Sequence, residues 1–215
     1  MIFSKPASMF SIPISILKAS YRVRPPELSE MTIRIETNRF FMRPLLPEDA
    51  TDKYLQWLRE DSARRFIVSA DMTSSISDLR AYIVSRLTRE DVLFLGIFDK
   101  TNGDHLGNIK FEPINRSLGI TVMGILIGDL KWQGKGVATE ILIGTTNWLY
   151  AEMGILECIL DVKRDNLAAI RAYKRAGFIE ESTSYIAVDS VKSVTMVRRP
   201  HQQYATKNAV KTSAE

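Results

Sequence analysis

The chain has 215 residues, enough for one domain with a well-buried core and short for two, and its modest net charge of +4 needs no polyanionic partner. Its apolar content of 45% and charged content of 25% suit a soluble globular protein, and no apolar run reaches the roughly 18 residues of a membrane-spanning helix. One cysteine excludes an intrachain disulfide and fits a reducing cytoplasm, and two isolated histidines predict no metal site.

Residues 1–31 are expected to form a flexible extension, because four prolines interrupt any regular element there. A regular pattern begins directly after Met31, which makes that methionine a candidate natural start. Residues 32–199 are expected to form one domain, and the polar residues 200–215 a frayed tail.

Hydrophobic periodicity and turn signals divide residues 32–199 into strands and helices. Ile120–Ile127 is nearly all apolar, which predicts a strand covered on both faces. Helices are expected from Pro47, from Ser77, over Gly136–Met153 and over Asn166–Ala176. Strands are expected at Ile33–Arg43, Val92–Phe98, Leu106–Glu112, Ile120–Ile127, Leu156–Val162, Phe178–Ser182, Tyr185–Asp189 and Val194–Arg199.

A glycine-rich turn, Gln133-Gly134-Lys135-Gly136-Val137-Ala138, joins the apolar strand to the long helix. The first N–H groups of a helix have no partner within it and carry a partial positive charge. Glycines let the backbone approach a ligand closely, so the turn predicts an anion site, and phosphate is the usual anion. Lys135 would add a direct positive charge.

Three phosphate-loop patterns compete for this turn. The nucleoside-triphosphate loop needs Ser or Thr after its lysine, but Gly136 follows Lys135. The dinucleotide pattern would place its third glycine on Thr139, and Asp161 is only a loose fit to its acidic residue. The third pattern, Gln/Arg-x-x-Gly-x-Gly/Ala, is matched in full by Gln133, Gly136 and Ala138. On the motif alone, a tight strand-to-helix turn that binds no ligand remains the alternative.

Further segments occur with the turn in a fixed order: Phe41-Met42-Arg43-Pro44 leading into Pro47-Glu48-Asp49, then Gly107-Asn108-Ile109, and residues 166–178, which end in Gly177-Phe178. With them, about residues 32–198 resemble the GCN5-related N-acetyltransferase superfamily, especially the branch of the ribosomal-protein N-terminal acetyltransferases. The resemblance implies an α/β (α+β) fold, a single mixed, mostly antiparallel central sheet of about six to seven strands flanked by about four helices. It also implies an acetyl-CoA-dependent N-acetyltransferase.

The same resemblance implies where acetyl-CoA binds. Its diphosphate would lie on the glycine-rich turn and its pantetheine arm along the end of the preceding strand, where a backbone N–H would stabilise the oxyanion. Asn166 and Tyr173 are seven residues apart, nearly two helical turns, so they share one helix face. The resemblance implies that Asn166 lies near the pantetheine arm and Tyr173 near the sulfur. The expected cofactor-binding residues are Leu126, Ile127, Gly128, Gln133, Gly134, Lys135, Gly136, Val137, Ala138, Thr139, Asn166 and Tyr173.

The expected chemistry is direct attack of the amine on the thioester, which needs no covalent enzyme intermediate. By the resemblance, Tyr173 would protonate the departing thiolate, and the ordinary tyrosine pKa of about 10 suits that task. Glu112 is the preferred general base and Asp129 the second candidate, although either carboxylate could be a solvated strand end and a water chain could replace both. Without a ligand, Asn166 would be a helix cap and Tyr173 a core aromatic.

The two early helices are expected to build the acceptor pocket, with Trp57, Arg64, Arg65 and Phe66 near it. The acceptor would be a protein N-terminus or a small amine such as an amino sugar or a polyamine. A non-catalytic acyl-CoA-binding sensor on the same scaffold is the alternative.

Neither a membrane nor nucleic acid is expected as a partner, since no nucleic-acid motif is present. A homodimer stays open, because edge strands near the C-terminus of such sheets often pair between subunits.

Overall fold

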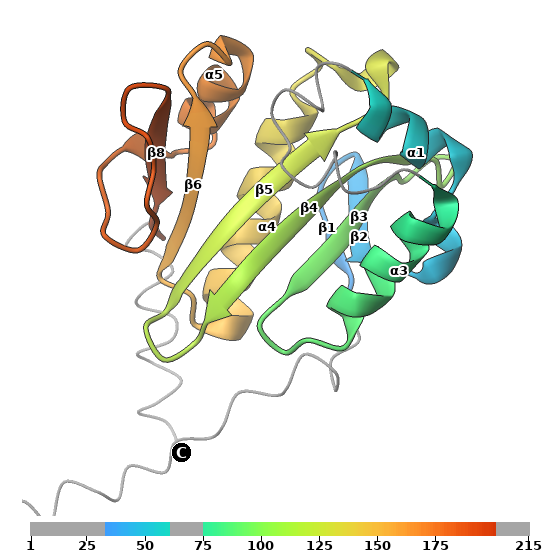
Figure 1. Cartoon of the computed structure of the whole chain (residues 1–215), viewed down its shortest axis with the longest axis horizontal. Coiled ribbons are helices and arrows are strands. Elements are labelled where there is room, and N and C mark those ends of the chain that lie inside the picture. Colours follow the sequence, from blue (N-terminus) through green and yellow to red (C-terminus); the bar gives the residue numbers. More distant parts are fainter. Residues whose placement is uncertain (1–32, 61–74, 201–215) are drawn as a thin grey trace, which may run out of the picture.

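The computed structural model describes residues 33–60 and 75–200. Within them, eight strands form one sheet in the order β1-β2-β3-β4-β5-β6-β8-β7 (Figure 1). The strands are β1 Ile35–Glu36, β2 Phe40–Pro44, β3 Leu93–Asp99, β4 His105–Asn115, β5 Ile120–Ile127, β6 Glu157–Lys163, β7 Ile179–Glu180 and β8 Ser193–Arg198. The helices are α1 Asp52–Arg59, α3 Ile76–Leu87, α4 Val137–Met153 and α5 Leu167–Arg175, with 3-10 turns η3 Pro47–Asp49 and η5 Leu130–Trp132. None of these helices is long and apolar enough to cross a membrane.

Helices cover both faces of the sheet. α4 and α5 pack on the rear face in Figure 1, and α1 and α3 pack on the front face near β2 to β4. β3 is buried at every position because Leu95 and Ile97 join the rear core while Phe94 joins the front core. No described helix covers the front of β5 and β6. The predicted mixed, mostly antiparallel sheet is confirmed, with β5 and β6 as its one parallel pair within the described residues.

Several predicted boundaries differ from the structure. The strand expected over Ile33–Arg43 is two strands, because the Thr37 N–H donates to the Phe40 carbonyl (2.9 Å) and closes a hairpin. The helix signal at Pro47 forms only η3, and α1 begins after Thr51, whose side chain accepts from the Tyr54 N–H. α3 begins at Ile76, one residue before the expected Ser77, because Ser75 and Asp78 form a capping box.

Two strand predictions are wrong in a way that matters for the front face. Residues 185–189 form no strand and belong to the loop between β7 and β8. β5 is not covered on both faces, since Gly124 is exposed and most other residues of this strand are half-buried. The sheet has eight strands where the resemblance implied about six to seven: the strand expected over Ile33–Arg43 forms both β1 and β2, and the strand expected over Phe178–Ser182 forms only the two-residue β7.

β5 and β6 separate along their length. β5 pairs with β4 from Ile120 to Ile127, but it pairs with β6 only as far as Val122 opposite Ile159. Beyond that point no described strand pairs with β5 on its β6 side, and Figure 1 shows the two strands diverging. Strand edges carry N–H and C=O groups that need partners, so this gap can accept an extended ligand as an additional strand.

Candidate active site

The glycine-rich turn is a cradle of backbone N–H groups at the start of α4. Gly134 and Gly136 have φ angles of +71° and +75°, in the left-handed region that favours glycine. The Gln133 N–H donates to Leu130 (3.2 Å) and the Glu140 N–H to Gly136 (3.1 Å). Between them, the six N–H groups of residues 134–139 donate to no group in the described chain. This number exceeds the four unpartnered donors of an ordinary helix start, so the cradle is suited to an anion.

Arg39 ties this turn to the β1–β2 hairpin. Its Nη2 donates to the Lys135 carbonyl (3.1 Å), and its Nε and backbone N–H donate to the two carboxylate oxygens of Glu140 (both 2.8 Å). The guanidinium thereby neutralises the one acid in the first turn of α4, which would otherwise repel an anion. Sequence reasoning missed Arg39, because 101 residues separate it from Glu140 and no local pattern joins them.

The other turn residues are held in different ways. Gln133 Nε2 donates to the Ile127 carbonyl (3.3 Å), which fixes the turn against the end of β5. The Lys135 ammonium lies 5.5 Å from the Trp132 ring centroid and pairs with no carboxylate of the described residues. The Thr139 hydroxyl donates to the Ala172 carbonyl (3.4 Å) and joins α4 to α5. Val137 is buried beneath the cradle, and Gly134 has open space above it.

At the end of β5, which is predicted to hold pantetheine, the backbone N–H groups point alternately toward β4 and toward the β5–β6 gap. The Gly128 N–H donates to the Leu106 carbonyl of the neighbouring strand (3.0 Å), so it is not available to an oxyanion. Backbone groups alternate in direction along a strand, so Leu126 also turns toward β4, while Ile125 and Ile127 turn toward the β5–β6 gap. The N–H groups that line the gap therefore belong to Ile125 and Ile127.

Tyr173 and Asn166 both come from α5. Tyr173 is buried, its ring centroid lies 5.8 Å from that of Phe178, and its hydroxyl makes no hydrogen bond to a described residue. Burial raises the pKa of Tyr173 to about 12, and the negative charge of Asp161 adds to the shift. The Asn166 side-chain oxygen accepts from the Ala169 N–H (3.2 Å) and caps the helix. The roles that need no ligand are thus present for both residues, and α5, which carries them, lies near the end of β6 where β5 and β6 diverge (Figure 1).

The structure does not bring Glu112 to the turn. β4 and β5 are antiparallel, and Gly107, not Glu112, lies opposite Ile127. Five residues of strand separate Gly107 from Glu112, about 17 Å. Burial alone would raise the pKa of Glu112, but a hydrogen bond from Lys110 and the charges of Lys110, Arg86 and Arg89 outweigh it and hold the pKa below its ordinary value. A carboxylate in that state is a weak base.

The second candidate base, Asp129, is nearer but is also paired. Its carboxylate lies 2.9 Å from the Lys53 ammonium and accepts from the Lys131 N–H (3.0 Å). Burial alone would raise the pKa of Asp129, but the hydrogen bonds from Lys53 and Lys131 hold it below its ordinary value. Asp129 therefore acts as the cap of η5 and as an anchor for α1.

Replacing Glu112 with glutamine should leave acetyl transfer and its pH profile unchanged within about twofold. It should instead cost about 1 kcal/mol of folding stability at pH 7, because three cations lose their shared partner. The folded-state pKa of Glu112 is depressed, so its contribution exists above the unfolded value of 4.5 and is lost as the pH falls through the lower, folded value. Thermal unfolding of both proteins at several pH values measures this, and a collapse of turnover in Glu112→Gln would contradict it.

A polar and aromatic cluster, Tyr54, Trp57, His105 and Asn108, lies beside the end of β5. A side chain on Gly128 would collide with the Trp57 ring, whose Cδ2 lies 2.1 Å from the ideal Cβ position. Asn108 Nδ2 donates to the Tyr54 hydroxyl (2.8 Å), and burial lowers the pKa of His105 to about 4, so its ring is neutral. Trp57 thus packs against Gly128 just beyond β5, and its place near an acceptor pocket stays a prediction, whereas Arg64, Arg65 and Phe66 lie outside the described residues.

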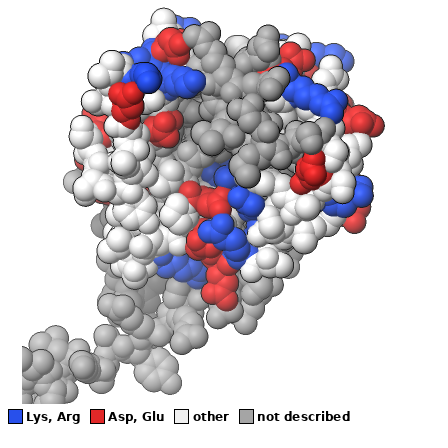
Figure 2. Space-filling view, in the orientation of Figure 1, with Lys and Arg blue, Asp and Glu red and all other residues white. Residues whose placement is uncertain are grey.

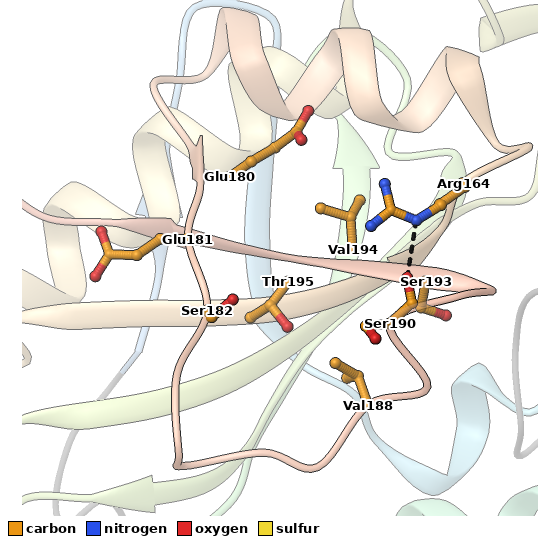
Figure 3. Close-up of a pocket in the computed structure, with 9 residues that line it drawn as sticks. All are labelled: Arg164, Glu180, Glu181, Ser182, Val188, Ser190, Ser193, Val194 and Thr195. Atoms are coloured by element: carbon orange, nitrogen blue, oxygen red, sulfur yellow. Dashed lines mark hydrogen bonds between the residues drawn. The ribbon is translucent and has the colours of Figure 1, made fainter.

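A pocket of about 230 Å³ lies between the β7–β8 loop and the start of β8 (Figure 3). Its two acids are neutralised, since Glu180 pairs with Lys174 (2.7 Å) and Glu181 with Arg199 (2.6 Å). It contains none of the predicted site residues, and among the described residues no cluster of His, Cys, Asp or Glu could hold a metal ion. It is lined by Arg164, Glu180, Glu181, Ser182, Val188, Ser190, Ser193, Val194 and Thr195.

Comparisons with known proteins show which family the chain belongs to and which structures share its fold. The profile of the acetyltransferase (GNAT) domain matches residues 39–179. The probable N-acetyltransferase YjcK of Bacillus subtilis is 27% identical over 174 residues, which cover 78% of this chain and 93% of YjcK. RimL, the ribosomal L7/L12 α-N-protein acetyltransferase solved in complex with coenzyme A, has a similar fold, with a TM-score of 0.66 and 15% identity over 78% of this chain and 98% of RimL. A chimera of Vibrio cholerae spermidine N-acetyltransferase SpeG with hSSAT has a TM-score of 0.64 and 17% identity over 78% of this chain and 99% of its own. The profile spans well over half of the sequence, and the chain therefore belongs to the GNAT acetyltransferase family.

Proposed function

We propose that this protein transfers the acetyl group of acetyl-CoA to a primary amine. The observation that carries the proposal is the cradle of six unpartnered N–H groups at residues 134–139, placed beside a gap between β5 and β6. Membership of the GNAT acetyltransferase family supports acetyl as the group that is transferred. Among the structural relatives, RimL was solved with coenzyme A and the microcin C7 self-immunity acetyltransferase MccE with acetyl-CoA and AMP.

The residues present fit acetyl-CoA in two places. The N–H groups of residues 134–139 and the Lys135 ammonium would hold the diphosphate, with Arg39 keeping the turn in shape. The edge of β5 facing the gap would pair with the pantetheine amides. The Asn166 side-chain oxygen is engaged as a cap, so its NH₂ group is the part that can donate to pantetheine.

In the transfer, the amine nitrogen bonds to the thioester carbon, the carbon–sulfur bond breaks, and the thiolate takes a proton. The Ile127 N–H faces the gap and is the donor that we assign to the oxyanion. Tyr173 is the acid that we assign to the sulfur, because α5 holds it in the rear core and burial raises its pKa to about 12, so that it keeps its proton at neutral pH. The ammonium proton leaves to water, since Glu112 and Asp129 are both held in ion pairs.

An acceptor screen tests this function. The purified full-length chain is incubated with acetyl-CoA and a panel of amines: a peptide with a free N-terminus, spermidine and an amino sugar. Thiol release is followed, and acetylated product is identified by mass. The proposal predicts amine-dependent thiol release with at least one acceptor. Binding of acetyl-CoA without transfer to any amine would favour the non-catalytic sensor instead.

A further inference from the structure

The connector between β5 and the cradle, residues 128–133, is held at its beginning by α1. The carboxylate of Asp129 lies 2.9 Å from the ammonium group of Lys53. The same ammonium group donates to the carbonyl of His105 (3.0 Å), the first residue of β4. Only 14% of the Asp129 side chain is exposed, so little water is available to replace Lys53 as its partner. Lys53 therefore joins α1, the start of β4 and the connector at one point.

Trp57 holds the same connector one helical turn further along α1. It follows Lys53 by four residues, so the two side chains lie on one face of the helix. A Cβ on Gly128 would lie 2.1 Å from the Trp57 Cδ2 atom, so the ring packs directly on the glycine backbone. The N–H groups of Gly128 and Asp129 both donate to the Leu106 carbonyl (3.0 Å each). The beginning of the connector is thus fixed by α1 and by β4 together.

The other end of the connector leads directly into the cradle. The Asp129 carboxylate accepts from the Lys131 N–H (3.0 Å) and so starts η5, and the Gln133 side chain returns to the Ile127 carbonyl (3.3 Å). Gly134 follows at once, and glycine does little to stiffen the backbone. The place of the cradle relative to the β5–β6 gap therefore depends on how the connector leaves β5.

We propose that the ion pair between Lys53 and Asp129 positions the cradle for acetyl-CoA. This inference rests on the proposed function and adds two positioning residues that act through the connector. A ligand held at two places gains full affinity only when the spacing of the two places is fixed, and the cradle and the gap are two such places. α1 lies on the front face of the sheet and α4 on the rear face, so the pair ties donor binding to a helix on the opposite side (Figure 1).

Charge alone predicts the opposite effect for Asp129. A carboxylate near a diphosphate repels it, so Asp129→Asn would strengthen acetyl-CoA binding if only charge mattered. If the ion pair positions the cradle, the same change should weaken binding about 3- to 10-fold. The asparagine oxygen can still accept from the Lys131 N–H, so the cap of η5 is kept. The sign of the change therefore separates positioning from electrostatics.

The test is calorimetric titration of full-length variants with acetyl-CoA. Asp129→Asn, Lys53→Met and the double variant should each weaken binding by a similar factor of about 3 to 10, because the pair acts as a unit. Lys53→Arg keeps the charge and should restore the affinity to within about twofold. The kcat at saturating acetyl-CoA should change by less than about twofold in every variant, because the thioester end of the donor is not displaced.

Lys131→Met is the matched control. It removes the same charge from η5, two residues from Asp129, and the Lys131 side chain forms no hydrogen bond or ion pair with a described residue. Acetyl-CoA affinity should stay within about twofold in this variant, because only charge acting through solvent is lost.

The outcomes separate the two claims. Unchanged or tighter binding in Asp129→Asn overturns the positioning role and leaves the proposed function standing. An equal loss in Lys53→Met and Lys131→Met also overturns it, because charge acting through space would explain both. A loss in Asp129→Asn that Lys53→Met does not share overturns it as well, because the cap of η5 would then be the cause. A wild-type chain that binds no acetyl-CoA contradicts the proposed function, and the positioning role with it.

Discussion

Replacing Gly134 with aspartate should weaken acetyl-CoA binding about 100-fold, whereas asparagine at the same position should weaken it only a few-fold. Gly134 has a φ angle of +71°, and Asn and Asp are the residues that tolerate this region best after glycine. No described atom lies within 4 Å of the position of its Cβ, so either side chain fits. The two variants have nearly the same shape and differ in one negative charge beside the cradle.

The size of the difference follows from Coulomb's law. A carboxylate about 6 Å from one negative charge of the diphosphate, at an effective dielectric constant of about 20, costs roughly 3 kcal/mol, or about 100-fold in affinity. The effect should shrink as salt is added, because the site is open to solvent. Calorimetric titration of both variants measures it, with thermal unfolding to confirm that they are equally folded. Equal affinities would show that the diphosphate does not lie on this turn.

Replacing Tyr173 with phenylalanine should lower kcat about 100- to 1000-fold and change acetyl-CoA affinity by less than about threefold. The hydroxyl makes no hydrogen bond to a described residue, so its removal leaves no group unpaired and should leave the fold intact. The ring itself, which packs near Phe178, is kept. Pre-steady-state thiol release is the suitable measurement, because slow product release would otherwise mask a loss in the chemical step.

The pH dependence of the transfer rate is a second test of the role of Tyr173. With its pKa raised to about 12 by burial and by Asp161, Tyr173 stays protonated throughout the accessible alkaline range. The rate should therefore rise with pH as the amine loses its proton, without an alkaline fall below about pH 10. A fall centred between pH 8 and pH 10, absent from Tyr173→Phe, would mean that the phenol titrates there and would contradict the burial argument.

Sequence patterns located the strands, helices and turn of the site because each rests on local chemistry. Glycines at positive φ, a capping asparagine and an apolar strand leave signals within a few residues. Arg39 left none, because its contacts with Lys135 and Glu140 depend on how a distant hairpin folds against α4. The strand prediction for residues 185–189 is wrong because an alternating pattern does not form a strand without a neighbouring strand to pair with.

The placement of Glu112 could have been predicted from topology. In a β4–β5 hairpin, the end of the first strand lies beside the start of the second, so Glu112 must lie far from the end of β5. In the parallel pair β5–β6 both carboxyl ends lie on the same side, so the end of β6, and not the end of β4, lies on the same side as the end of β5.

Calorimetric titration of the purified full-length chain with acetyl-CoA, beside acetyl-pantetheine, which lacks the diphosphate, tests the central claim most directly. If the cradle at residues 134–139 holds a diphosphate, acetyl-CoA should bind with a dissociation constant of about 1–100 μM, and acetyl-pantetheine at least about 100-fold more weakly. No heat from acetyl-CoA at millimolar concentration, or equal affinity for the two compounds, would contradict the account.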